Sequence, residues 1–251
     1  MEGVSYEIHI TYACEGEEPR SHICASNTTT AVLSDLKSGM EYNFNLTVVL
    51  PNGSCSKTSS ACVHTKPSAP GRVKVTDVES RSVTLCLERP VSMEGVSYEI
   101  HITYGCEGED ARSHICASNT TTAVLSDLKP GMEYNFNLTA VLPNGSCSKT
   151  SSACVQTKPS APGRVKVTDV ESRSVTLCWE RPVSMEGVSY EIHITYGCEG
   201  EEPRSHICAS NTTTAVLSDL KTGMEYNFNL TAVLPNGSCS KTSSACVHTS
   251  E

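Results

Sequence analysis

The chain has 251 residues and a formal net charge of −9. This acidic balance argues against nucleic acid or an anionic membrane surface as the main partner, because both require a basic footprint. No apolar run approaches the ~20 residues of a membrane span, and the N-terminus lacks the basic and then apolar pattern of a secretory signal. We therefore expect no membrane insertion by this segment.

One 92-residue unit occurs twice, at 67–158 and 159–250, with six differences. Residues 1–66 repeat the last 66 residues of that unit, from Met93 onward, again with six differences. A unit of this length can bury a core and fold alone, and its period is too long for solenoid or propeller repeats. The predicted organisation is a partial domain at 1–66 followed by domains at 67–158 and 159–251.

Within the unit, apolar residues alternate with polar ones, which is typical of half-buried strands. In chain order the predicted inward sets of the third copy are Val175, Leu177 and Trp179; Tyr190, Ile192 and Ile194; and Tyr226, Phe228 and Leu230 with Ala232 or Val233. Turn signals such as RPVSMEG, GCEGEE, LKTG and LPNGS separate these runs. About seven short strands in a unit of this size predict an all-β antiparallel sandwich without helices.

The strings PSAPGRVKVTDVESRSVTLCWERP, SYEIHITY and SDLKPGMEYNFNLTAV resemble a fibronectin type III domain. The most specific features are Trp179 on the second strand and LKPGMEY, where Tyr134 matches the tyrosine-corner position of the family. Tyr42 and Tyr226 occupy the same position in the other copies. The resemblance implies an immunoglobulin-like fold with strands A, B and E in one sheet and C′, C, F and G in the other.

Leu87 takes the place of the core tryptophan in the middle copy. A smaller side chain at a position where a tryptophan packs leaves less buried area and room for a cavity. We therefore expect the middle domain to be less stable than the third.

The resemblance implies that residues 1–66 supply strands C to G and lack A and B. Strand E would then have no sheet neighbour, and a set of apolar residues would face a gap: Tyr6, Ile8, Ile10, Tyr42, Phe44 and Leu46. One interpretation is that Met1 is an internal methionine, equivalent to Met93 and Met185, and that the chain is a piece of a longer array. The other is that the half-domain accepts strands from a donating partner.

Each complete unit contains five cysteines. In the middle copy, Cys106 and Cys116 flank the C–C′ turn, Cys147 and Cys154 flank the F–G turn, and Cys86 is left over on strand B. Either flanking pair could meet the α-carbon separation of roughly 4.4 to 6.8 Å that a disulfide needs, and we predict two disulfides per unit. The alternative is that all are reduced thiols of a cytosolic protein. Over the three copies the candidates are Cys14, Cys24, Cys55, Cys62, Cys106, Cys116, Cys147, Cys154, Cys198, Cys208, Cys239 and Cys246.

N-x-S/T sequons recur in every copy and are candidate glycosylation sites if the protein is secreted. The candidates are Asn27, Asn45, Asn119, Asn137, Asn211 and Asn229. Asn137 is predicted to point outward between the inward-facing Phe136 and Leu138. A third sequon at Asn144-Gly145 is better explained as a turn dipeptide.

Histidine and cysteine occur together near the C–C′ turn, where His114 and Cys116 share one face and His101 lies near Cys106. The close ligand spacings of structural zinc sites are absent, and so are G-x-S-x-G, H-E-x-x-H and phosphate-binding glycine loops. We expect no metal site, no cofactor, no catalytic residue and no enzyme activity.

The function implied by the resemblance is that of protein-binding and spacer modules in an extracellular adhesion or receptor protein. The links at 65–71 and 157–163 carry prolines and predict semi-rigid spacing of neighbouring domains. A protein ligand, which the sequence does not identify, would contact the B–C, C′–E or F–G loops or the outer face of the C–F–G sheet. The alternatives are a cytosolic scaffold or immune-sensor array with reduced cysteines, and an ectodomain piece of a receptor tyrosine phosphatase.

Overall fold

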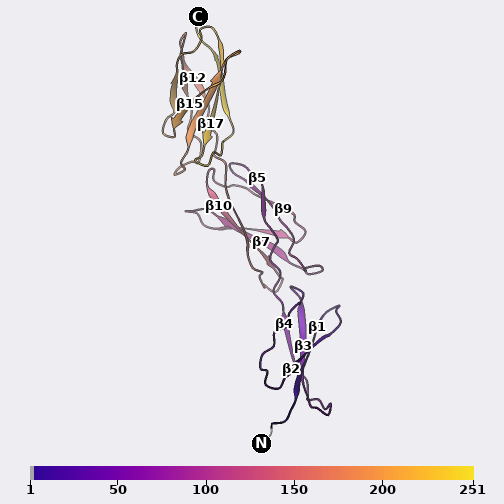
Figure 1. The fold of residues 1–251 in the computed structure, drawn as a ribbon. Coiled ribbons are helices and arrows are strands. Elements are labelled where there is room, and N and C mark those ends of the chain that lie inside the picture. The colour runs from indigo at the N-terminus through magenta and orange to yellow at the C-terminus, as the bar shows by residue number, and fades with distance from the viewer. Residues whose placement is uncertain (1–2) are drawn as a thin grey trace.

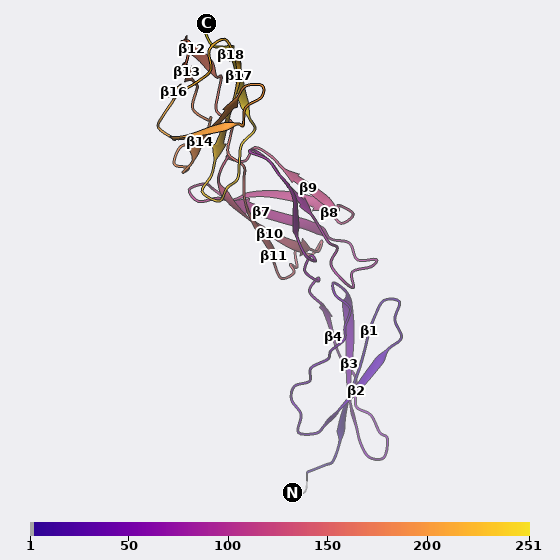
Figure 2. The same cartoon turned by 45° about the horizontal axis from the view of Figure 1, so that its top comes forward.

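A computed structural model describes residues 3–251 and arranges them as three modules that follow one another end to end, with the chain termini at opposite ends (Figure 1). The view in Figure 2, turned by 45°, shows the same succession. The regular structure of residues 3–251 consists of eighteen strands without a helix, which confirms the predicted all-β class. In this part of the chain no helix is long and apolar enough to cross a membrane. Met1, on which both interpretations of the first copy depend, lies outside the described residues.

The middle module is a sandwich of two antiparallel sheets. Its strands are β5 (Lys74–Val78), β6 (Val83–Cys86), β7 (Glu99–Gly105), β8 (Arg112–Ala117), β9 (Thr122–Leu125), β10 (Glu133–Val141) and β11 (Ser151–Gln156). One sheet has the order β5-β6-β9 and the other β11-β10-β7-β8. These orders correspond to the A-B-E and C′-C-F-G sheets that the resemblance implies.

The third module repeats this topology. Its strands are β12 (Lys166–Val170), β13 (Val175–Cys178), β14 (Glu191–Gly197), β15 (Arg204–Ala209), β16 (Thr214–Leu217), β17 (Glu225–Val233) and β18 (Ser243–His248). Its sheets have the orders β12-β13-β16 and β15-β14-β17-β18. The alternation along each strand places one set of side chains between the sheets, as predicted.

The predicted inward residues of the third module lie in its core, except that Tyr190 is half-buried at the edge of the core. On β17 it is Ala232, and not Val233, that is buried. Trp179 and Leu87 occupy equivalent places in the two cores. The Nε1–H of Trp179 is buried without a hydrogen-bond partner among the described residues. A buried indole N–H usually finds an acceptor, so the tryptophan adds apolar area at the expense of an unpaired donor.

In residues 3–66 the structure describes one sheet, with the order β2-β1-β3-β4. Its strands are β1 (Glu7–Cys14), β2 (Arg20–Ala25), β3 (Glu41–Val49) and β4 (Ser59–His64), at the expected positions of C, C′, F and G. Residues 30–33 lie outside any strand, although the equivalent residues form β9 (Thr122–Leu125) and β16 (Thr214–Leu217), at the position of strand E, in the other modules. The reason is that β9 and β16 pair with β6 and β13, and a strand forms only where its backbone has a ladder partner.

Candidate functional site

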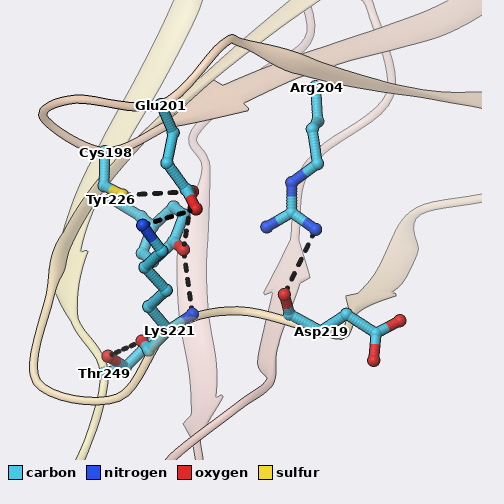
Figure 3. A network of polar contacts seen from close by, with 7 residues as sticks. All are labelled: Cys198, Glu201, Arg204, Asp219, Lys221, Tyr226 and Thr249. Carbon is cyan, nitrogen blue, oxygen red and sulfur yellow. Dashed lines mark hydrogen bonds and ion pairs between the residues drawn. The ribbon is translucent and has the colours of Figure 1, made fainter.

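A polar network covers one end of each sandwich, where the C–C′ turn meets the turn before strand F (Figure 3). In the third module the hydroxyl of Tyr226 accepts a hydrogen bond from the backbone N–H of Lys221 at 2.9 Å. The same hydroxyl lies 3.4 Å from a carboxylate oxygen of Glu201, and the Lys221 ammonium lies 2.9 Å from the other. Thr249 completes the network by donating its hydroxyl to the Lys221 carbonyl at 2.6 Å.

The pKa values of the groups in this network shift in the directions that hydrogen bonding and burial dictate. The Lys221 ammonium and then the Cys198 thiol hold the pKa of Glu201 below its usual value. Glu201 in turn raises the pKa of Lys221. Burial raises the pKa of Tyr226, so its phenol stays protonated and available as donor and acceptor. Near neutral pH, Lys221 and Tyr226 therefore keep their protons and Glu201 is ionised. The three groups act as hydrogen-bond and ion-pair partners that hold the turns in place.

An arginine extends the network across the sheet. Arg204 lies 5.0 Å from the centre of the Tyr196 ring and donates to the backbone carbonyl of Asp219 at 3.2 Å. Asp219 has a left-handed backbone, with φ of 58°, which an aspartate tolerates in a turn. The same contacts recur at Arg20 and Arg112, so the cluster is a structural feature of every copy.

The strand register does not bring the predicted disulfide partners together. Cys116 lies opposite Ile100 on β7, whereas Cys106 lies six residues further along, or about 20 Å at the usual rise per residue. Cys154 lies opposite Asn135 and Cys147 opposite Val141, again six residues apart along β10. All fourteen cysteines of the chain are free thiols in the structure. The spacing suggested pairs across a turn, but Cys106 stands directly before the C–C′ turn and Cys116 lies far along the next strand, whereas Cys147 already follows the F–G turn and so lies on the same side of it as Cys154.

The exposed cysteines of strand G lie beside a carboxylate. Cys62 donates its thiol to Glu41, whose carboxylate is 3.8 Å from His64. This resembles a nucleophile and base in composition, but the hydrogen bond to Glu41 raises the pKa of the Cys62 thiol. A reactive cysteine requires the opposite shift, toward the thiolate. The cluster therefore does not have the electrostatics of a nucleophilic site.

The candidate metal ligands are separated in the fold. His101 forms a 3.0 Å pair with Glu99 on the outer face, whereas Cys106 and Cys116 are buried in the core. Residues 3–251 contain no group of three or more histidine, cysteine or acidic side chains arranged to hold a metal ion.

All six candidate glycosylation asparagines are solvent-exposed. Asn137 points outward between buried Phe136 and Leu138, as predicted, and accepts a hydrogen bond from Ser152 at 2.7 Å. Asn144 instead caps a turn, because its side-chain oxygen accepts from the Ser146 N–H at 2.8 Å while Gly145 has a φ of 84°. The turn interpretation of Asn144-Gly145 is confirmed.

A repeated contact joins each module to the next. A methyl group added at Gly131 would lie 2.8 Å from Val188, 3.3 Å from Met185 and 3.4 Å from Leu234, all in the following module. Gly39 makes the equivalent approach to Val96, Met93 and Leu142. Both glycines have a positive φ, so the turn requires glycine for its conformation as well as for the close approach.

Polar contacts reinforce this joint. Arg81 donates to the Ser184 hydroxyl at 2.9 Å, and Asn236 donates to Gln156 at 2.7 Å, both across the boundary between the second and third modules. The prolines of both links are buried, in agreement with the prediction of semi-rigid spacing. A pocket of about 530 Å³ remains beside the first joint, lined from both modules by residues that include Glu15, Glu41, His64, Val96, Leu142 and Asn144.

A row of side chains crosses the outer face of each C′-C-F-G sheet. In the middle module Ile115, His101 and Thr139 lie opposite one another on β8, β7 and β10. Ile115 is 56% exposed, and Ile23 and Ile207 at the same position are equally exposed. Successive copies therefore present the same exposed isoleucine at the same point of the sheet.

The sequence interpretation missed the joint glycines and this isoleucine row. Gly39 and Gly131 stand in LKSG and LKPG, which indicate a turn but give no signal of a contact with another module. Ile115 and Cys116 are both apolar neighbours, so alternation alone does not show which of them faces the core. In the structure Cys116 is buried and Ile115 is exposed.

Comparison with known proteins shows relatives that carry this module. The chain is 27% identical to "Fibronectin type III domain-containing protein 2" of Margaritifera margaritifera over 217 residues, which are 82% of this chain and 34% of the relative. It is also 27% identical over 191 residues to human "Receptor-type tyrosine-protein phosphatase eta", covering 76% of this chain and 13% of that protein. The chain thus spans about a third or less of the length of these curated relatives.

The fold is found in solved structures as well. A "two fibronectin type-III domain segment from chicken tenascin" superimposes with a TM-score of 0.55 at 22% identity, covering 72% of this chain and all of that one. The family model of the fibronectin type III domain matches residues 68–156 and 160–247, which coincide with the two complete sandwiches. The chain belongs to the fibronectin type III family.

Proposed function

We propose that this chain is a run of protein-binding spacer modules from an extracellular adhesion or receptor protein. The observation that carries the proposal is the repeated joint between modules. Gly39 and Gly131 each pack closely against a methionine, a valine and a leucine at equivalent positions of the next module. A joint of fixed composition holds successive modules in line and presents equivalent faces at regular intervals. Modules of this family occur in receptors such as phosphatase eta, which supports the assignment.

The joint narrows the choice of binding surface. Met93, Val96 and Leu142 belong to the B–C and F–G connections, and these residues contact the preceding module. The surfaces left free in every copy are the C′–E loops and the outer face of the C′-C-F-G sheet. We place the protein contact on the outer row that contains Ile115, because three equivalent isoleucines are exposed there.

In this proposal the domains are those expected from the repeat: a partial domain at 1–66 and complete domains at 67–158 and 159–251. The exposed sequons, among them Asn119 and Asn137, carry glycans. Any catalytic activity of the whole protein belongs to other domains. The relation to phosphatase eta favours a receptor ectodomain among the extracellular alternatives.

One observation favours a second candidate, a cytosolic scaffold: all fourteen cysteines are free thiols. Treatment of the native protein with peptide N-glycosidase separates the two. The extracellular proposal expects faster gel migration after treatment. Unchanged migration, with recovery of the protein in the cytosolic fraction, would reject it in favour of the scaffold.

A further inference from the structure

Two rows of side chains run side by side across the outer face of each C′-C-F-G sheet. In the middle module the first is the isoleucine row, formed by Ile115, His101 and Thr139. The second row lies two residues away on each strand, and its members lie opposite one another on β11, β10, β7 and β8: Ser152, Asn137, Thr103 and Ser113. Because Asn137 is a sequon asparagine, a candidate modification site stands beside the proposed contact row.

The side chain of Asn137 is held with its amide nitrogen free. The hydroxyl of Ser152 donates a hydrogen bond to the side-chain oxygen of Asn137 at 2.7 Å. The amide nitrogen Nδ2, to which a glycan attaches, has no hydrogen-bond partner among the residues that the structure describes. The same bond recurs in the other copies at 2.6 and 2.7 Å, from Ser60 to Asn45 and from Ser244 to Asn229.

The isoleucine row lies within reach of a group attached to Asn137. Thr139 follows Asn137 by two residues on β10, and Ile115 lies opposite Thr139 at a distance of two strands. At a rise of about 3.4 Å per residue and a strand spacing of about 4.8 Å, Ile115 is about 12 Å from Asn137. The ring of His101, which lies between them, turns toward the Glu99 carboxylate at 3.0 Å, on the side away from Asn137.

The two sides of Asn137 differ in what they offer to a sugar. The row on its other side contains Asn135 and Gly105, followed by Cys154, and has no aliphatic side chain. The isoleucine row presents Ile115, which is 56% exposed. Sugar rings have an apolar C–H face, so a glycan that lies toward Ile115 removes apolar area from water, whereas one that lies the other way does not.

We propose that Asn45, Asn137 and Asn229 carry N-linked glycans whose first sugars lie over the isoleucine row of the same module. This face is then open to a protein ligand only in modules that lack that glycan. The inference rests on the proposed extracellular location and adds a regulation of the proposed binding surface.

The modification itself is a glycosyl transfer to the nascent chain, before β10 pairs with its neighbours. The asparagine Nδ2 forms a bond to the anomeric carbon of an oligosaccharide that is carried on a lipid diphosphate. The bond between that carbon and the diphosphate oxygen breaks, the lipid diphosphate leaves, and Nδ2 loses one proton. The side-chain oxygen keeps its lone pairs, so the bond from Ser152 to Asn137 is compatible with the glycan.

The test uses the full chain secreted from cultured animal cells, and the sequence allows the middle module to be measured separately. Lys129 precedes a proline, which blocks trypsin, whereas the equivalent lysines of the other copies precede serine or threonine. Trypsin therefore releases residues 113–149 as one peptide that is unique to the middle module. Enzymatic removal of N-glycans converts each occupied asparagine to aspartate, and mass spectrometry of this peptide is expected to find the conversion at Asn137.

Hydroxyl-radical labelling of the intact protein then measures the exposure of Ile115 in the same peptide. Asn137→Gln removes the glycan and is expected to increase the labelling of Ile115 at least about threefold, because a bulky group no longer covers it. Val124 is 60% exposed on the other sheet of the same module and serves as the internal reference. The matched control Asn119→Gln removes a glycan from the C′–E loop and should leave the labelling of Ile115 unchanged.

The same variants made in bacteria, without glycans, separate the sugar from the substitution. In this form Asn137→Gln and the parent chain should label Ile115 equally. An unmodified Asn137 in the secreted chain would overturn the inference, and so would equal labelling of Ile115 with and without its glycan. Because secretion is imposed in this experiment, these outcomes leave the extracellular proposal to the N-glycosidase test of the native protein. Absence of N-glycans there would reject both.

Discussion

The hydroxyl of Tyr226 accepts a hydrogen bond from the backbone N–H of Lys221 at 2.9 Å, while its ring is completely buried (Figure 3). Equivalent bonds join Tyr42 to Lys37 and Tyr134 to Lys129. The tyrosine thus fastens the turn before strand F to the core in each copy, as the family resemblance implied.

Replacing this tyrosine tests that role. Tyr226→Phe keeps the buried ring and removes the acceptor of the Lys221 N–H, so we expect a loss of about 1–2 kcal/mol in the third module. Trp179 is the sole tryptophan of the chain, and its fluorescence in a denaturant titration reports that module alone. The control is Tyr190→Phe, which removes a longer bond of 3.3 Å to Ser210. Equal losses for the two variants would contradict the assignment.

The ion pair above this tyrosine predicts a dependence on pH. The pKa of Glu201 is lowered in the folded state, so its contribution to stability is present above the unfolded value and disappears as the pH falls through the folded pKa. Glu201→Gln should therefore lower the unfolding midpoint at neutral pH and match the parent chain in acid.

The matched control is Glu199→Gln in the same turn, where the side chain is exposed. It changes the net charge equally but removes no contact with Lys221. A Glu201→Gln effect that persisted undiminished in acid would show that the carboxylate charge is not its source.

Much of the fold could be predicted from the sequence because alternation decides which side chains enter a sandwich. Val175, Leu177 and Trp179 are buried as their period predicts. The cysteine pairs could not be found in this way, because pairing depends on register, and the register places Cys116 opposite Ile100. Contacts between modules, such as Gly131 with Val188, leave no periodic signal in either segment.

The thiols give a direct chemical test of the register. Cys147 and Cys154 are exposed, whereas Cys116 is buried. Partial desolvation and then a hydrogen bond to Glu133 raise the pKa of the Cys154 thiol. Under native conditions without reductant, we expect an alkylating reagent to modify Cys147 first, Cys154 more slowly, and Cys116 only on unfolding. Mass spectrometry identifies the modified peptides. Recovery of a Cys106–Cys116 or Cys147–Cys154 cross-linked peptide would contradict the described register.

The two cores differ at one large side chain, and exchanging it tests their relative stability. Leu87→Trp should stabilise the middle module by about 1 kcal/mol, because added apolar area is partly offset by an indole N–H without an acceptor, as at Trp179. Calorimetry of the full chain measures the midpoints of both modules. The control is Trp179→Phe, which removes the unpaired donor and keeps an aromatic ring. A lower unfolding midpoint of the middle module in Leu87→Trp would show that the core has closed around Leu87 and leaves no room for the larger side chain.

The joint between modules can be tested with two glycines of the same conformation. Gly131 and Gly223 have φ values of 68° and 63°, so alanine strains the backbone of each to a similar degree. At Gly131 the added methyl group would lie 2.8 Å from Val188 of the next module. At Gly223 the nearest described atom belongs to Glu251, at 3.8 Å.

We therefore expect Gly131→Ala and Gly223→Ala to destabilise the second and the third module, respectively, to a similar degree. Only Gly131→Ala should also let these two modules move relative to each other. Residual dipolar couplings should show that the second and third modules share one alignment in the parent chain and in Gly223→Ala, but have different alignments in Gly131→Ala. The contact of Gly131 with Met185, Val188 and Leu234 is then what holds the modules in line. If Gly131→Ala kept a common alignment, the link and the bond between Arg81 and Ser184 would be sufficient to fix the angle.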